Sequence, residues 1–166
     1  MLALARRLLG VEQEARACTY DACLAAARSW NGAGEESECD ARAFLRVTAR
    51  LALERLRARP PQGEEEIRAL LPRFRRDGHR APRGAASRSL AASAALLPIL
   101  DPRSEVQACI DRLPRRYREA LLLCDVERFE ERDAAELLAL SSARLRSILH
   151  GARLALLEML QREELV

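Results

Sequence analysis

The stretch SSARLRSILHGARLALLEML, residues 141–160, decides the fold predicted for this chain. Its apolar residues recur every three or four positions, which predicts an amphipathic helix with one buried face. Residues 141–153 hold three arginines and no acid, whereas residues 120–140 hold six acids and two arginines. This reversal of charge across a short connection predicts two helices with different neighbours. The apolar positions of the second helix are Leu145, Ile148, Leu149, Ala152, Leu156, Met159 and Leu160.

The two predicted helices form a helix-turn-helix pattern. Residues 129–138 read as a short helix, and residues 139–141 read as a tight turn. The first helix needs a small residue where the second helix crosses it, and Ala135 meets that need. Leu145, ten positions later, faces back towards it. The pattern therefore predicts that the second helix is held by its apolar face and presents its basic face outward.

The basic face has the chemistry of a DNA-reading helix. A serine at position 141 or 142 caps the helix, and the free amides behind such a cap can meet a phosphate. Arginine is the side chain best suited to read guanine. A solvated basic face without a ligand fits the charge and periodicity equally well. The outward polar residues are Arg144, Arg146, Ser147 and His150, with Arg153 placed further along to touch a backbone.

Composition favours an all-helical protein that is not an enzyme. The chain has 166 residues, of which 49% are apolar and 4% aromatic, and Leu and Ala supply most of the apolar part. These are strong helix formers, while strand-forming residues are scarce. The net charge of +3 is too small to indicate a polyanionic partner by itself. We find no nucleophile with its base, no paired acid site and no phosphate-binding glycine loop, so we expect no catalytic activity.

The cysteines indicate a reducing compartment, and the hydropathy indicates no membrane span. The five cysteines show no C-x-x-C spacing. We therefore expect reduced thiols, no metal site and no cofactor. No apolar run reaches the ~18 residues of a membrane span, and no signal peptide is evident. We expect a cytoplasmic protein.

Breakers divide the chain into three parts. Residues 1–59 are expected to be helical, residues 60–104 to be a flexible linker, and residues 105–166 to be helical again. The linker carries six of the seven prolines. Within the first part, helices are expected at 2–9, 12–30 and 40–59, ended by Gly10, by a glycine-rich stretch and by two prolines.

The third part resembles region 4 of bacterial extracytoplasmic-function (ECF) sigma factors, which belong to the sigma-70 family. The resemblance covers ACIDRLPRRYREALLLCDVERFEERDAAELLALSSARLRSILHGARLALLEML, residues 108–160. Its marks are the pair Leu113-Pro114, the triplet 117–119 and the acidic triplet 125–127. Upstream, LALARRLLG (2–10) and AFLRVTARLALERLRAR (43–59) resemble region 2 of the same family, so the order of the parts also agrees.

The resemblance implies a promoter-specificity subunit made of two helical domains, region 2 and region 4, on either side of a linker. Its partners would be core RNA polymerase, promoter DNA and an anti-sigma factor. By position, the residues at the −35 element would be Ser142, Arg144, Arg146, Ser147, His150 and Arg153. Those at the −10 element would be Arg46, Arg50 and Arg57. The surface for core polymerase would include Asp21 and Leu24.

Several residues depart from the family pattern. At the core-binding positions of the second helix, which read Ala17, Tyr20, Asp21 and Cys23, only one acid of the family pattern is kept. The chain also begins within what is usually the first helix of region 2. Arg128 and Ala139 stand where the family usually has glycine, and Gly151 stands inside the recognition helix. These departures leave two alternatives open. One is a degenerate sigma-like interaction protein that does not open DNA, and the other is an autonomous helix-turn-helix regulator.

Overall fold

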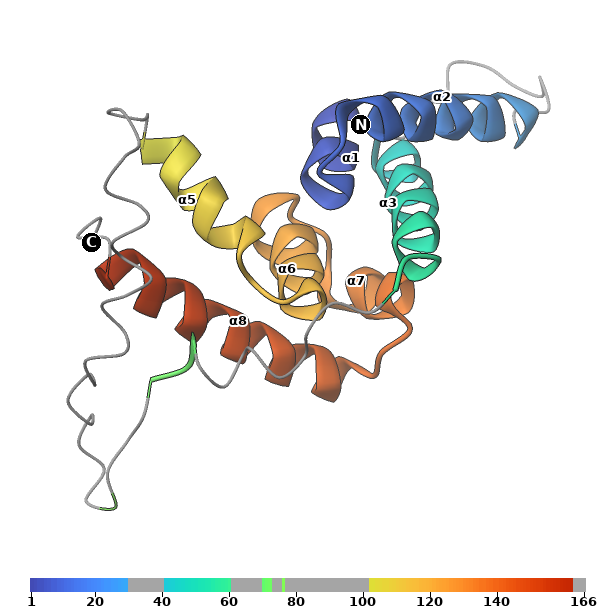
Figure 1. Cartoon of the computed structure of the whole chain (residues 1–166). Helices are drawn as coiled ribbons and strands as arrows, with labels where there is room; N and C mark the ends of the chain where they lie inside the picture. The colour runs from blue at the N-terminus through green and yellow to red at the C-terminus, as the bar shows by residue number, and fades with distance from the viewer. Residues whose placement is uncertain (30–40, 61–69, 73–75, 77–101, 163–166) are drawn as a thin grey trace. The chain divides into compact units, whose positions relative to one another are not determined.

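The fold is all-helical, as predicted. The computed structural model describes residues 1–29, 41–60, 70–72, 76 and 102–162, and these ranges contain helices and no strand. None of the described helices is long and apolar enough to span a bilayer. The elements, labelled in Figure 1, are α1 (Leu2–Leu9), α2 (Glu12–Ser29), α3 (Ala41–Arg57), α5 (Pro102–Asp111), α6 (Arg115–Leu121), the π-helical turn η4 (Leu122–Val126), α7 (Glu131–Leu138) and α8 (Ser142–Arg162).

The chain divides into two compact units. One unit joins residues 1–61 to residues 122–145, and the other joins residues 62–121 to residues 146–166. The expected limits of the sequence domains, 1–59, 60–104 and 105–166, stay a prediction, because most of the linker lies outside the described residues.

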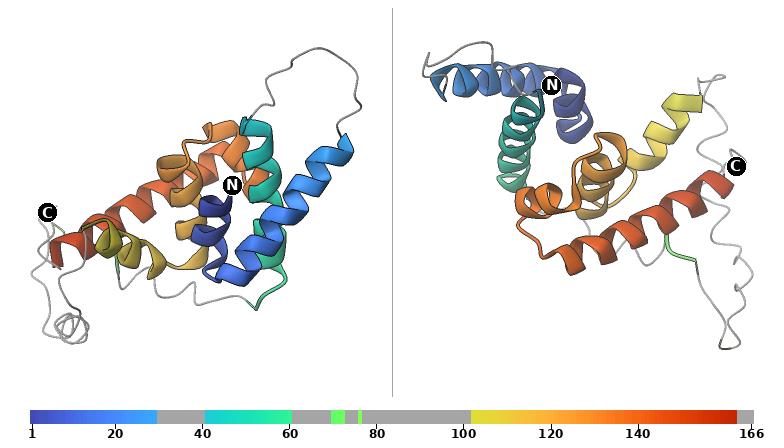
Figure 2. Two further views of the ribbon diagram at one scale, coloured as in Figure 1. Left: turned by 90° about the horizontal axis from the view of Figure 1, so that it is seen from above. Right: turned by 180° about the vertical axis from the view of Figure 1, so that it is seen from behind.

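Three helices, α1, α2 and α3, pack against one another in the first unit (Figures 1 and 2). Helix α1 ends at Gly10, as predicted. Gly10 has a left-handed φ of 72°, and its amide donates to the carbonyl of Arg6 at 2.9 Å. Leucines from α1 and α3 fill the middle of the bundle, where Leu4, Leu8 and Leu53 are each about 1% exposed. Burying such side chains stabilises each helix by roughly 1.5–3 kcal/mol per leucine.

Small side chains are buried on both α2 and α3. Cys18 and Ala22 of α2 and Ala49 and Ala52 of α3 are fully buried. The thiol of Cys18 donates to the carbonyl oxygen of Thr48 at 3.7 Å. Burial raises the pKa of the Cys18 thiol, partly opposed by the charge of Arg55 and aided by that of Asp21. Cys18 is therefore a buried neutral thiol, as expected for a reduced structural cysteine.

Two arginines near the end of α3 hold it to α1 and α2. Arg55 pairs with Asp21 and donates to the carbonyl of Glu14 at 2.9 Å. Arg59, just beyond the helix, pairs with Glu14 and donates to the carbonyl of Leu9 at 3.2 Å. Arginine suits this role, because its fork reaches a carboxylate and a carbonyl at the same time.

The second unit contains α5, α6 and α8 from Arg146 onward. Arg115 and Glu119 form an ion pair of 2.8 Å along α6, and both side chains are largely buried. The ring of Tyr117 lies on α8 at Gly151, where an added Cβ would stand 3.1 Å from the ring. The buried apolar residues of the second unit are Cys109, Ile110, Leu113, Ala120, Leu121, Ile148, Leu149, Ala152, Ala155 and Met159.

The connection from α6 to α7 differs from the expected one. The sequence predicted a helix from residue 129, but α7 begins at Glu131. Leu122–Val126 form a π-helical turn, in which the amide of Glu127 donates to the carbonyl of Leu122 at 2.9 Å. The wider turn is followed by Arg128 with a φ of 58°. Arg128, where the resembled sigma factors usually have glycine, thus has a left-handed backbone.

Candidate nucleic-acid interface

The turn between α7 and α8 is built on a left-handed alanine. Ala139 has φ 55° and ψ 46°, and its amide donates to the carbonyls of Ala135 and Glu136. The amide of Leu140 also donates to the carbonyl of Ala135, at 2.9 Å. These bonds satisfy two of the carbonyls in the last turn of α7 and end the helix within one residue. The tight turn expected from the sequence is therefore present at the expected residues.

Ser141 caps α8. Its Oγ accepts a hydrogen bond from the amide of Arg144 at 3.2 Å, so the cap is Ser141 and not Ser142. Ala135 and Leu145, the predicted contact pair of a helix-turn-helix, are 4% and 0% exposed. Both residues are therefore buried, as the helix-turn-helix pattern requires.

The predicted −35 residues all lie on the exposed side of α8. At about 3.6 residues per turn, the buried residues of α8 occupy roughly one third of its circumference. The polar residues lie on the remaining arc, with Ser147 and His150 near its middle and Arg144 at one edge. Those that are exposed are Ser142, Arg144, Arg146, Ser147, His150 and Arg153. This row of cationic and hydrogen-bonding side chains has the geometry of a helix that enters a DNA groove.

The arginines predicted at the −10 element share one face of α3. Arg46, Arg50 and Arg57 are all exposed. The spacings of four and seven residues place them within roughly a quarter of the helix circumference. Arg42 lies on the same face, one turn before Arg46. Arg42 was not among the residues predicted from the sequence, although its spacing of four from Arg46 places it on this face.

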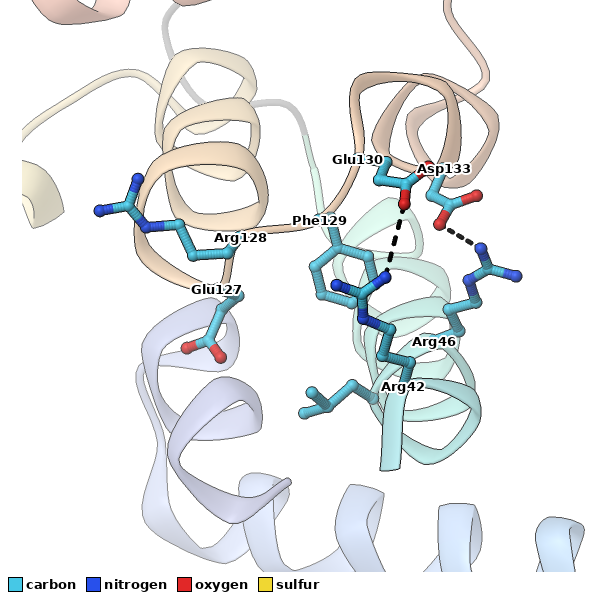
Figure 3. A pocket seen from close by; sticks show the side chains of 8 residues that line it. Arg42, Arg46, Glu127, Arg128, Phe129, Glu130 and Asp133 are labelled. Carbon is cyan, nitrogen blue, oxygen red and sulfur yellow. Dashed lines mark hydrogen bonds and ion pairs between the residues drawn. The ribbon is translucent and has the colours of Figure 1, made fainter. Parts of the chain in front are cut away.

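Three of these four arginines contact α7. Arg42 pairs with Glu130 at 3.4 Å, and Arg46 pairs with Asp133. Arg57 donates to the carbonyl of Leu137 at 2.7 Å. Figure 3 shows Arg42 and Arg46 reaching from α3 towards the acids at the start of α7.

A small pocket lies beside these ion pairs, with an empty volume of about 450 Å³ that includes open solvent. The ring of Phe129 forms part of its wall, together with both arginines and both acids (Figure 3). Its lining holds three arginines and three acids, which suits a contact between helices better than an anionic ligand. The lining residues are Arg42, Leu45, Arg46, Glu127, Arg128, Phe129, Glu130 and Asp133.

The residues predicted to meet core polymerase lie on the exposed side of α2. Leu24 is 38% exposed, and Asp21 is exposed while paired with Arg55. Tyr20, 66% exposed, is also on this side, and Cys23 is exposed rather than structural. In the described part of the chain, no three His, Cys, Asp or Glu side chains gather as metal ligands.

The comparisons with known proteins agree with the helix-turn-helix geometry. Residues 103–156 match the family model "Sigma-70, region 4". Among solved structures, the chain is similar to the sigma factor RpoE of Bartonella quintana, determined in complex with the anti-sigma factor NepR. The similarity has a TM-score of 0.58 at 20% identity, and it covers 96% of this chain and 89% of that one. A comparison with curated proteins found no match.

Proposed function

We propose that this chain, whose region 4 and fold support an ECF-type sigma-70 factor, directs core RNA polymerase to specific promoters. The observation that carries the proposal is the region 4 match at residues 103–156. This segment contains the capped helix α8 with its exposed basic face. The protein would act by binding and strand separation, and the polymerase would perform the catalysis. We propose no catalytic activity and no cofactor for the chain itself.

We assign recognition of the −35 element to α8. Arginine can bind guanine through two hydrogen bonds in the major groove, and each good contact of this kind contributes about 1–3 kcal/mol of discrimination. Arg146 and His150, one turn apart on the exposed arc, are placed for base edges. Ser142, close to the cap, and Arg153, three residues beyond His150, are placed for phosphates. Arg144 and Ser147 complete the proposed reading surface.

We assign the −10 element to the basic face of α3 and the polymerase contact to α2. Arg46, Arg50 and Arg57 supply positive charge for a phosphate backbone. Leu24 and Asp21 supply an apolar and an acidic contact on the exposed side of α2. Residues 1–59 would then be region 2 and residues 105–166 region 4, with residues 60–104 as the linker.

The other proposed partner is an anti-sigma factor, since the similar RpoE was crystallised with one. We further propose that the protein works in the cytoplasm, where its polymerase and DNA are found. The absence of a membrane-spanning helix among the described residues agrees with this location.

The test is the affinity of the purified chain for core RNA polymerase, measured together with that of Leu24→Arg. We expect tight binding by the natural sequence and a loss of at least tenfold in the variant. Ala27→Arg is the matched control, because Ala27 is exposed on the same helix and gains the same charge. Absence of binding by the natural sequence would contradict the sigma-factor role. It would leave the sigma-like interaction protein, and DNA binding without polymerase would indicate the autonomous regulator.

A further inference from the structure

Each of the three acids of α2 forms an ion pair with an arginine of the same unit. Two of these arginines lie in α3 or just beyond it, one lies in α1, and one lies in α2 itself. A carboxylate beside a guanidinium presents little net charge to a partner. Within residues 12–29, all of which the structure describes, no acid therefore has an unbalanced charge. The pairs join Glu12 to Arg6 and Arg16, Glu14 to Arg59, and Asp21 to Arg55.

Arg55 holds the carboxylate of Asp21 against the bundle. One terminal nitrogen of Arg55 pairs with Asp21, and the other donates to the carbonyl of Glu14 at 2.9 Å. The guanidinium thereby bridges two turns of α2. The side chain of Asp21 is 50% exposed. The one acid kept at the core-binding positions is thus a ligand of α3, and little of its charge is left for a partner.

An uncharged apolar row is exposed on the same helix. Tyr20 is 66% exposed, Leu24 is 38% exposed, and Ala17 is exposed as well. Spacings of three and four residues place them on one side of α2, away from the fully buried Cys18. We call Ala17, Tyr20 and Leu24 the α2 stripe. Its composition is that of the centre of a protein interface, where tyrosine is enriched and charged residues are depleted.

We propose that core polymerase binds α2 by apolar contact with the α2 stripe, with Tyr20 as the anchor, and not by attraction to acids. The polymerase surface opposite the stripe is then apolar and needs no cation. This contact differs from the one implied by the family pattern, in which more than one acid stands at these positions. The inference rests on the proposed polymerase contact of α2 and names the chemistry of that contact.

Core polymerase is the occupant because the α2 stripe is continuous with the residues assigned to it above. Leu24 belongs to both sets, and Asp21 follows Tyr20 in the chain. A tyrosine and a leucine can each fill a pocket on a partner and contribute most of the binding energy. A half-exposed acid that is already paired contributes little.

The first measurement is the affinity of the full chain for core RNA polymerase. Tyr20→Ala should lower the affinity about 30-fold or more, the factor that corresponds to a hot-spot side chain. Because Tyr20 is mostly exposed, its truncation leaves the bundle folded. Asp21→Asn should lower the affinity only about 1.4- to 5-fold, the factor that corresponds to one exposed ion pair.

Val11→Ala is the matched control. Val11 is 45% exposed and lies just before α2, outside the α2 stripe, so its truncation should leave the affinity unchanged. An equal loss in Val11→Ala and Tyr20→Ala would overturn the inference. A larger loss in Asp21→Asn than in Tyr20→Ala would also overturn it.

The second measurement repeats the comparison at low and at high salt. The factor lost in Tyr20→Ala should be the same at both, because salt screens charges and not apolar contacts. A factor that shrinks at high salt would indicate a contact between charges and would contradict the proposal.

Urea unfolding tests the internal role of Asp21. Asp21→Asn and Arg55→Gln should each lower the free energy of unfolding, and the double variant should lower it by less than the sum of the two. Additive effects would show that the two side chains act independently. The charge of Asp21 would then be unbalanced, and the argument for an uncharged contact would fail.

The outcomes separate this inference from the proposed function. If the natural chain does not bind core polymerase, both are wrong. If it binds and Tyr20→Ala binds equally well, only the inference is wrong. The inference also fails if the natural chain forms a dimer that Tyr20→Ala dissociates without a change in polymerase affinity, because a second copy then covers the α2 stripe.

Discussion

Replacing Ala139 by glycine should stabilise the protein. Ala139 ends α7 with a φ of 55°, a conformation in which a Cβ crowds the following carbonyl oxygen. Its amide donates to the carbonyls of Ala135 and Glu136 in the last turn of α7, so the residue is held in this conformation. Glycine would keep the amide bonds and remove the crowding. We therefore expect the free energy of unfolding to rise.

The size of the effect is a difference of two terms. The left-handed conformation costs an alanine about 1–2 kcal/mol. Glycine loses more backbone freedom on folding, which costs about 0.4–1 kcal/mol. The net gain is about 0.8 kcal/mol, which corresponds to a rise in Tm of about 2–3 °C for a chain of this length. Arg128, with a φ of 58°, should respond to glycine with the same sign.

Urea unfolding followed by circular dichroism measures this change directly. Ala25→Gly is the control, because Ala25 is exposed within α2, where glycine costs about 0.8–1 kcal/mol relative to alanine. The two substitutions are chemically identical, yet we expect opposite signs. If both destabilise by similar amounts, Ala139 is not left-handed in solution, and the turn that positions α8 is wrong.

Three further predictions concern the recognition helix, its packing and the thiols. Arg146→Ala should lower transcription from the cognate promoter about 5- to 150-fold and relax the base preference at one −35 position. Unchanged promoter strength and choice in run-off assays would show that Arg146 does not belong to the reading surface. Gly151→Ala should change the unfolding free energy by less than about 1 kcal/mol, because the gain in helix propensity is offset by the Cβ placed 3.1 Å from the ring of Tyr117. The larger side chain of Gly151→Val should destabilise the protein by about 1–3 kcal/mol. Equal urea midpoints for the two variants would refute this packing. Iodoacetamide should modify exposed Cys23 much faster than Cys18 in the native protein. Cys18 is buried, and its raised pKa lowers the fraction of reactive thiolate. Equal rates of modification by peptide mass spectrometry would contradict the burial of Cys18.

Local patterns in the sequence were enough to predict most of the helices and the site on α8. The spacing of Leu145, Ile148 and Leu149 predicted the buried face. The serines at 141 and 142 predicted the cap, which the structure assigns to Ser141. The charge reversal around residue 141 separated α7 from α8. These features depend on residues three or four positions apart, which is the range over which a helix repeats.

The features that were missed depend on longer-range structure. Three consecutive buried leucines, residues 121–123, are compatible with both an α-helix and a π-turn, so their pattern did not predict the wider turn. The pairing of Arg46 with Asp133 joins residues 87 positions apart. No local periodicity connects two such residues, and only the packing of α3 on α7 brings them together.

The central claim is that this chain gives core RNA polymerase a promoter preference. The most direct test is to map the 5′ ends of transcripts that core polymerase makes on host genomic DNA, with and without the purified chain. The account predicts a small set of new start sites that share upstream −10 and −35 sequences and are weakened by Arg146→Ala. The same start sites with and without the chain would contradict the claim.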